Sequence, residues 1–567
     1  MSRPIRPQTL SSADRQCALA VLLVLLGLYA ATLSTPFDNP DAEVEYQTTR
    51  SLALGRGLAL GTDTPEGAAL VALRFNVREG AHGGFYSWFG VGQAALAVPL
   101  WWAGRLIGEL GTDIEARHAA AEPHMGVARS EYFPHLLVAA RNPLLGAATA
   151  ALLLLCARRL GASRPAAFAA ALLFGVTTFA WPQARSSLSD VQAAFFVVLA
   201  FDGWLATRAA FVRLERPRRR VLLLLGFALA GAGLTRVAVA PALVVIAAAV
   251  VWTLVRGHYA LRSQPLVRRR SGPRALAADA GYVAAPALGG FVLLLLLNAV
   301  RFGDPLETGY GAALGSFFDY SPLLGAAGLL VSPGRGLVWM APLIVLVPFG
   351  LWRGRGDRSA WLVVVGASAG LLALVAPSQG WHGAWTFGPR YLLPALPLLW
   401  CAVAIALDPL ARSRFLMVLA TPLVVAGLLV ALGGVFVDHS THQDLAIRAA
   451  RTAWPADDAL SEREADEGRF LNIQWDWRFA APWAHWRILR HRVAGLGEDF
   501  PLKRLFGVDE AGTLAPTHAR DRGFSHFAWV DLHRRLGGRA SMPLAFCAAA
   551  AALGIVFAVR ALDPTRP

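Results

Sequence analysis

Apolar segments of membrane-spanning length recur along the chain, and they restrict its fold more than any other feature. A helix needs about 20 mainly apolar residues to cross the hydrocarbon core of a bilayer. Only 16% of the 567 residues are charged, whereas about a quarter are charged in soluble domains. The sequence therefore predicts an all-α polytopic membrane protein with a bundle of about 12 transmembrane helices, in a range of about 11–13. The predicted spans are 17–35, 136–157, 166–183, 190–209, 220–237, 238–255, 279–299, 336–352, 360–376, 390–407, 414–436 and 541–560.

The positions of the arginines predict the orientation of the bundle. The net charge is +15, and Lys503 is the single lysine. Arginine-rich loops, like the basic N-terminus, are expected to be cytoplasmic. They all fall on that side only if the apolar stretch 89–110 does not cross the membrane. We therefore expect 36–135 to be a long first external loop with a juxtamembrane or re-entrant helix at 89–110. The arginine-rich loops are 158–164, 208–220, 256–274, 353–358 and 412–414.

On this topology the chain has three parts. Residues 1–436 form a transmembrane module, 437–540 form a Trp-rich extracytoplasmic region, and 541–567 hold the last transmembrane helix and a cytoplasmic tail. The basic loops lack interleaved aromatic platforms for bases, so we expect no nucleic-acid partner. The preference for arginine over lysine suggests a GC-rich bacterium, and hence a multi-pass protein of the bacterial plasma (inner) membrane. All four cysteines lie in or beside apolar segments, which argues against disulfides and zinc–thiolate sites.

Four carboxylates follow directly after the first apolar segment: Asp38, Asp41, Glu43 and Glu45. Charged groups are costly near hydrocarbon, and an anchor does not need them. They indicate chemistry at the membrane face, with Asp38, Asp41 or Glu43 as a base. Such carboxylates could also hold a divalent cation, although we expect no stable metal there.

Arginines in the predicted outer loops are candidates for binding phosphate. Arg185, Arg335 and Arg390 each lie among Gly, Pro and aromatic residues, and a guanidinium can bind two phosphate oxygens at once. The alternative is that they anchor helix ends at the interface. The polar and aromatic residues that could contact a substrate are Tyr86 and His82 in the first outer loop, and Glu307, Tyr310, Trp381, His382 and Trp385 in later loops.

Two histidine segments have competing interpretations. His82 lies between glycines, so it could hydrogen-bond a substrate or simply occupy a turn. Residues 438–444 carry ligand-type side chains at helical spacing. We favour a solvated start of the extracytoplasmic region over a metal site there.

Several catalytic motifs are missing from the sequence. It contains no Walker-type or HExxH motif, and no cytoplasmic nucleotide-binding domain is predicted. An enzyme that works outside the cell has no supply of nucleotide sugars. It would need a donor activated within the membrane, such as a polyprenyl-phosphate sugar.

Three segments late in the chain carry a resemblance to a known family. They are Arg301–Pro305 with Thr308–Tyr310, Ser332–Gly336, and Gly388–Pro394. Together with the acidic first loop, they resemble the bacterial GT-C glycosyltransferases. That group includes enzymes similar to dolichyl-phosphate-mannose protein mannosyltransferases and to aminoarabinose transferases. The resemblance covers roughly residues 17–435 and implies a GT-C-like catalytic module over 1–436.

The resemblance also implies roles for particular residues. The first-loop Asp of the family, a general base or acceptor-orienting group, corresponds best to Asp41. Relatives carry adjacent Asp and Glu where this chain has Asp41-Ala42-Glu43, which leaves Asp41, Glu43 and Asp38 open. The phosphate-binding arginine corresponds to Arg390, with Arg185 and Arg335 as further candidates. Tyr86 lies where relatives have a lysine, so Arg78 or Arg141 would supply that positive charge.

These observations lead to an expected function. The chain would be a hexosyl or pentosyl transferase that uses a polyprenyl-phosphate sugar donor and inverts the anomeric centre. Its acceptor would be an envelope glycan, lipid or protein at the extracytoplasmic face. A lipid-linked saccharide transporter or flippase, an oligosaccharide ligase and a non-catalytic scaffold remain alternatives. A transporter would carry charges along a path at helix centres, whereas here they gather at helix ends.

Overall fold

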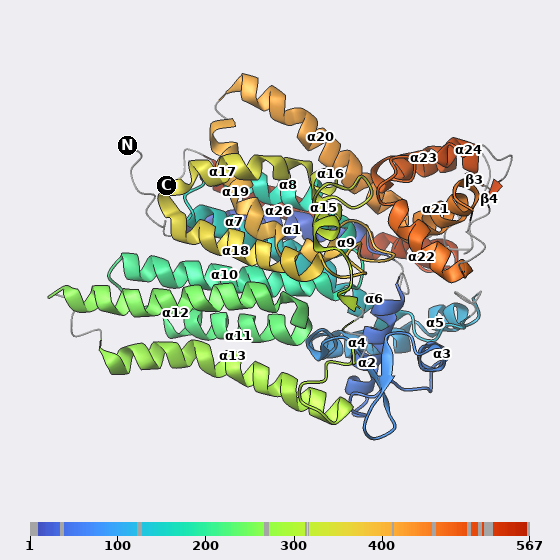
Figure 1. The fold of residues 1–567 in the computed structure, drawn as a ribbon, viewed down its shortest axis with the longest axis horizontal. Coiled ribbons are helices and arrows are strands. Elements are labelled where there is room, and N and C mark those ends of the chain that lie inside the picture. The colour runs from blue at the N-terminus through green and yellow to red at the C-terminus, as the bar shows by residue number, and fades with distance from the viewer. Residues whose placement is uncertain are drawn as a thin grey trace.

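The fold is a bundle of long helices with shorter elements gathered at one end of it (Figure 1). The twelve apolar segments predicted from the sequence all form helices. Two small antiparallel sheets accompany them, β1 (Val77–Glu79) with β2 (Phe85–Ser87), and β3 (Phe500–Pro501) with β4 (Thr513–Leu514). The computed structural model describes residues 10–34, 39–121, 127–265, 272–311, 315, 317–410, 413–455, 461–495, 500–508, 513–514 and 526–563.

Eight helical segments among the described residues are long and apolar enough to cross a membrane. The predicted count of about twelve spans is therefore not confirmed, because the other four apolar segments are shorter. The eight are α1 (Ser12–Ala31), α6–α7 (Phe133–Ala139 and Arg141–Arg159), α10 (Ser189–Val212), η1–α12 (Val237–Val239 and Ala240–Ser263), α13 (Pro273–Phe302), η4–α18 (Arg355–Asp357 and Arg358–Val375), α20 (Arg414–Phe436) and α26 (Ser541–Leu562).

Proline explains two of the shorter segments, since it cannot donate a backbone hydrogen bond and clashes with the preceding turn. Pro342 separates α16 from the helical turns after it, and Pro394 and Pro397 flank the start of α19. The four predicted segments that are too short form α8 (Arg164–Val176), α11 (Arg219–Thr235), α16 with η3–α17 (Leu337–Met340, Pro342–Leu346 and Val347–Arg353), and η5–α19 (Arg390–Leu392 and Leu396–Leu410).

Small residues let the bundle helices approach closely. α1 packs against α7 and α26, so the last helix lies beside the first. A methyl group at Gly27 would overlap the backbone of Cys547, and one at Gly554 would lie 2.8 Å from the carbonyl oxygen of Ala20. α11 packs in the same way against α10 and α13. This close packing through small residues is typical of membrane helices, where apolar lipid cannot drive association.

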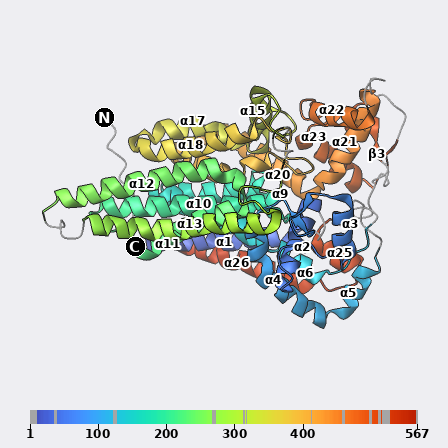
Figure 2. The same cartoon turned by 60° about the horizontal axis from the view of Figure 1, so that its bottom comes forward.

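The 36–135 region forms a helical layer at one end of the bundle (Figure 2). Its α4 confirms that 89–110 is helical, but α4 is not among the eight candidate spans. α4 packs against α2 and α6, and the Trp101 indole donates to the Tyr46 hydroxyl at 3.1 Å. Whether α4 lies at the membrane surface stays a prediction. The helices of this layer are α2 (Pro40–Ala53), α3 (Pro65–Leu73), α4 (Val91–Leu110) and α5 (Thr112–Ala119).

The 437–540 region lies at the same end of the bundle and has its own apolar core (Figure 2). Phe479, Ile488 and Phe506 are among the buried residues of that core. The region follows α20 directly, and α23 packs back on α20. A bridge between Ser34 and Phe527 joins it to the end of α1. Its helices are α21 (His439–Ala453), α22 (Glu462–Asn472), α23 (Ala481–Val493), α24 (Leu502–Phe506) and α25 (Ala528–Arg534).

Candidate active site

Asp41 and Arg390 form an ion pair although 349 residues separate them in the chain. Both terminal nitrogens of Arg390 lie near one oxygen of Asp41, at 3.2 and 3.3 Å. The other Asp41 oxygen accepts a hydrogen bond of 2.7 Å from the Asn76 amide. Asp41 is the best of the candidate bases in the sequence analysis and Arg390 the best of the candidate phosphate-binding arginines, and the fold brings these two side chains together.

Local sequence positions both members of this pair. The Asn39 side chain accepts the backbone N–H of Asp41 at 2.8 Å, and Pro40 follows it at the start of α2. Both features favour a helix start at this point. On the other side, Gly388 has a φ of +76°, which favours glycine. The turn places Arg390 at the start of η5.

Tyr391 connects Arg390 to a second guanidinium, that of the partly buried Arg236. The Tyr391 ring centroid lies 4.9 Å from the Arg390 guanidinium carbon and 5.0 Å from that of Arg236. Arg236 also donates to Asp190 at 2.6 Å. The sequence analysis did not select Arg236 or Asp190. Arg236 could have been found in the sequence, because it is an isolated arginine where two apolar segments join. A charge at such a place is costly and therefore indicates a functional residue.

A cavity of ≈ 750 Å³ begins at Arg236 and Tyr391. Most of its lining is apolar and comes from α12, α13 and α18, together with Tyr310 and Phe317. Asn298 and Arg301 add polar atoms to the wall, near the end of α13. The cavity therefore combines a large apolar volume with a cationic border next to the Asp41–Arg390 pair.

Glu45 lies one helical turn after Asp41 and is buried. Burial raises the pKa of Glu45 to about 8, against the opposing effect of the Arg141 guanidinium. One of its carboxyl oxygens has no hydrogen-bond partner among the described residues. Arg141 itself is buried and donates to the backbone oxygens of Gln93 and Ser187 at 3.3 and 3.5 Å. The raised pKa favours the protonated form of Glu45 at neutral pH, and the sequence analysis did not choose Glu45 as a site residue.

Glu43, another candidate carboxylate, contacts His135 and Gln47 and does not join the Asp41–Arg390 pair. An oxygen of Glu43 lies 3.1 Å from His135 Nε2, and another contact of 2.8 Å comes from the Gln47 amide. Glu43 therefore takes part in the packing of α2 against α6. Asp38 lies outside the described residues.

Arg335 and Arg185 bind backbone oxygens. Arg335 is fully buried and donates to Ala384 at 2.5 Å and to the Gln474 side chain at 3.0 Å. Arg185 donates to the carbonyl of Thr32 at 2.6 Å and lies 4.8 Å from the Phe527 ring centroid. Both residues connect distant segments of the backbone, and a role of either one in phosphate binding stays a prediction.

Tyr310 lines the cavity on the side of the β1–β2 hairpin, and Arg78 and Glu307 lie behind it. Arg78 pairs with Glu307 at 2.9 Å, and Glu307 accepts the backbone N–H groups of Gly309 and Gly311. These contacts hold Tyr310 against the cavity. Tyr86 is buried in β2 with its ring edge toward Phe302, whereas His82 is exposed in the hairpin turn.

The Trp381–Trp385 loop packs mainly against the 437–540 region. Trp381 is fully buried, with its ring near Tyr320 and Trp475. His382 accepts the backbone N–H of Ala384 at 3.0 Å, and burial lowers the pKa of His382 to about 3. Trp385 is 43% exposed and is the residue of this loop most accessible to a ligand.

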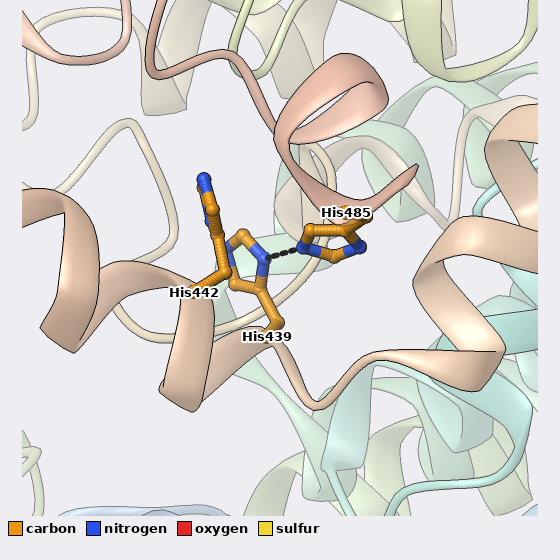
Figure 3. Close-up of side chains that lie close together, drawn as sticks. All are labelled: His439, His442 and His485. Carbon is orange, nitrogen blue, oxygen red and sulfur yellow. Dashed lines mark hydrogen bonds between the residues drawn. The ribbon is translucent and has the colours of Figure 1, made fainter. Parts of the chain in front are cut away.

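The segment 438–444 differs from the interpretation favoured for the sequence. It was expected to be a solvated start of the C-terminal region, but His439, Thr441, His442 and Gln443 are buried. The reason is that α21 packs these side chains against α23. His439 and His442 lie beside His485 of α23 (Figure 3).

Comparison with protein families supports part of this description. Residues 125–275 match the sequence model of the dolichyl-phosphate-mannose-protein mannosyltransferase family. This match confirms the predicted resemblance to that class of membrane glycosyltransferases. The matched range includes Arg141, Asp190 and Arg236 but not Asp41 or Arg390. No curated protein sequence matches the chain.

Solved structures with a similar arrangement are distant. The oligosaccharyltransferase AglB from Archaeoglobus fulgidus, in complex with an inhibitory peptide and a dolichol-phosphate, is 13% identical, with a TM-score of 0.40 over 79% of this chain and 59% of that one. ArnT from Cupriavidus metallidurans, bound to undecaprenyl phosphate, is 14% identical, with a TM-score of 0.38. The match covers 96% of this chain and 76% of ArnT. The S. cerevisiae protein O-mannosyltransferase Pmt1-Pmt2 complex bound to the sugar donor is 16% identical, with a TM-score of 0.32. The match covers 57% of this chain and 37% of the matched chain. The chain thus spans about 59% of the length of the archaeal protein.

Proposed function

We propose that the chain is an integral membrane glycosyltransferase of the GT-C type. It moves a hexosyl or pentosyl unit from a polyprenyl-phosphate donor to an envelope glycan, lipid or protein. The observation that carries this proposal is the Asp41–Arg390 pair beside a largely apolar cavity bordered by Arg236. The family match over 125–275 supports the same reaction class. The proposed location is the bacterial inner membrane, with the site on the extracytoplasmic side and the N-terminus inside.

The cavity suits a lipid-linked donor. Its apolar lining would contact the first part of the polyprenyl chain, since burial of apolar surface is favourable. The donor phosphate would lie at the cationic border, beside Arg236 and on the side of the Asp41–Arg390 pair. Charge-assisted hydrogen bonds to phosphate are stronger than neutral ones. This arrangement would place the anomeric carbon near Asp41.

The reaction is a single displacement. The acceptor hydroxyl attacks the anomeric carbon, and the bond between that carbon and the phosphate oxygen breaks. The electron pair leaves with the lipid phosphate, which the guanidinium groups stabilise. The hydroxyl proton goes to Asp41 as the general base. Attack from the face opposite the leaving group inverts the anomeric centre.

The Asp41–Arg390 pair gives this scheme an order of events. Without donor, Arg390 holds one Asp41 oxygen and Asn76 holds the other. A donor phosphate would compete for Arg390 and release an Asp41 oxygen for the acceptor hydroxyl. Donor binding would then precede activation of the acceptor.

Transfer of radiolabelled sugar from a set of polyprenyl-phosphate donors, by purified protein in lipid, tests the proposal. Wild type should transfer sugar, and Asp41→Asn should lower the rate at least about a hundred-fold, the usual contribution of a general base. The matched control is Asp113→Asn, at an exposed position of α5. Donor binding without any transfer would contradict the transferase and favour the transporter. Full activity of Asp41→Asn would exclude Asp41 as the base.

A further inference from the structure

Three buried histidines meet where α21, α23 and the end of α20 come together (Figure 3). His439 and His442 lie three residues apart on α21, a spacing that puts both on one helix face. His485 approaches them from α23. One ring nitrogen of each histidine lies within 4.8 Å of the corresponding atoms of the other two. The proposed glycosyl transfer does not use these three side chains.

Backbone carbonyls fix the orientation of two of the rings. His442 Nε2 lies 2.8 Å from the carbonyl oxygen of Phe479, and His485 Nδ1 lies 3.0 Å from that of Gly433. A carbonyl accepts a hydrogen bond, so each of these nitrogens carries the proton. The opposite nitrogens, His442 Nδ1 and His485 Nε2, therefore carry lone pairs. Metal-binding histidines are typically oriented by a second-nitrogen hydrogen bond of this kind.

The remaining contacts leave the cluster short of hydrogen-bond partners. His439 Nδ1 lies 3.2 Å from His485 Nε2, and His442 Nδ1 has the Gln443 amide at 3.4 Å. In the part of the chain that the structure describes, His439 Nε2 is buried without a partner. Two nitrogens bound to one tetrahedral Zn²⁺ at about 2.0–2.1 Å lie roughly 3.3–3.4 Å apart. The separation of His439 Nδ1 and His485 Nε2 is close to that value.

The type of ligand decides which metal the cluster suits. All three candidate ligands are imidazole nitrogens. A metal that bonds strongly to imidazole is favoured over Mg²⁺ or Ca²⁺, which prefer oxygen ligands.

We propose that His439, His442 and His485 bind one Zn²⁺ ion, which fastens α21 to α23 beside the end of α20. Three protein ligands leave the fourth position of a tetrahedral ion to water. A small cavity of ≈ 60 Å³ borders His439 and is large enough to hold a water molecule. The ion would fix the base of the 437–540 region and does not enter the proposed glycosyl transfer.

Metal analysis of the full-length protein in detergent tests this site. The protein is stripped with a chelator, incubated with Zn²⁺ and dialysed, and its zinc content is then measured. Wild type should hold about one zinc per chain, and the variants His442→Gln and His485→Gln should hold much less. The matched control is His491→Gln, another buried histidine of α23, which should keep the zinc. No zinc in reconstituted wild type, or undiminished zinc in both ligand variants, would overturn the site.

A second measurement covers variants that fail to fold, since it needs only the wild type. Co²⁺ in place of Zn²⁺ should give the visible absorption of a tetrahedral ion, and Zn²⁺ should raise the unfolding temperature of the stripped protein. A featureless Co²⁺ spectrum together with no thermal shift would contradict the proposal. Glycosyl transfer is measured separately, so loss of the proposed enzyme activity would leave this result standing.

Discussion

Arg236 and Arg390 both contact the Tyr391 ring, and both lie where a donor phosphate is proposed to bind. Arg236 has an additional constraint because it pairs with Asp190, which is 1% exposed. Removing one partner of a buried ion pair leaves an uncompensated charge, whereas neutralising both avoids that cost. Any test of Arg236 in donor binding therefore has to change Asp190 with it.

The double variant Asp190→Asn/Arg236→Gln should bind the donor about ten- to a hundred-fold more weakly, because a hydrogen bond to a charged group contributes roughly 1.5–3 kcal/mol. The effect should appear in the KM for donor, with kcat changed much less. Arg105→Gln, on the exposed surface of α4, is the control. An unchanged KM in the double variant would exclude Arg236 from the donor site.

Glu45 predicts how stability depends on pH. The raised pKa means that the folded protein binds a proton that the unfolded chain has lost between about pH 4.5 and 8. Below about pH 4.5 the carboxyl is neutral in both the folded and the unfolded protein, so its burial carries no ionisation cost. As the pH rises toward 8, the unfolded chain is favoured because it can lose the proton, and the free energy of unfolding falls.

Glu45→Gln removes this titration. Its unfolding temperature should exceed that of wild type by a margin that grows between about pH 5 and 8, the window set by this pKa. Thermal unfolding in detergent across that range measures the margin, and Glu79→Gln in the exposed part of β1 is the control. A margin that does not vary with pH would show that Glu45 titrates normally.

At the scale of residues, sequence reasoning reached the side chains whose chemistry stands out locally. Asp41 and Arg390 could be selected from their loops, and the fold joins them. Arg236 and Tyr391 could not be paired, because their meeting depends on how α11, α12 and η5 pack. His439 and His442 were noticed from their spacing, but their burial and the approach of His485 depend on the packing of α23.

Among the elements, α13 offers a direct test of close helix packing. Gly289 and Gly290 are neighbours, yet only Gly290 faces another helix. A methyl group at Gly290 would overlap the Ala230 side chain of α11, whereas one at Gly289 would meet no atom within 4 Å.

Gly290→Ala should destabilise the protein by about 1–3 kcal/mol, the usual cost of overpacking. Gly289→Ala should be neutral or slightly stabilising, since Ala favours helix by about 1 kcal/mol over Gly. Thermal unfolding of both variants in the same detergent gives the comparison. Equal stabilities would mean that α11 and α13 lie further apart than the structure has them.

The positions of helices were largely predictable, and their lengths were not. Each predicted apolar segment forms a helix, because apolar runs of this length have few other ways to satisfy their backbone in lipid. Interruptions within the runs were missed. Hydropathy alone gave 336–352 as one span, whereas Pro342 lies at a break in the helix.

For the whole molecule, the links between the 437–540 region and the bundle matter most. Arg335 stands at the centre of one such link, since it joins Gln474 to the backbone of Ala384, in the loop that leads to Arg390. Burial lowers the pKa of Arg335 to about 9, which reflects the cost of holding a charge there without a carboxylate. No sequence pattern pairs Arg335 with Gln474, which lies 139 residues away.

Arg335→Met should weaken this link and loosen the loop before Arg390. The loss of hydrogen bonds from a buried charged group is expected to cost about 1–3 kcal/mol or more in stability. Limited proteolysis should cut the 437–540 region faster, and glycosyl transfer should fall through kcat, because Arg390 and Asp41 would be held less firmly. Arg353→Met, on the exposed end of α17, is the control. If proteolysis and transfer both match wild type, then the C-terminal region does not support the active site, and Asp41 with Arg390 must be positioned by the bundle alone.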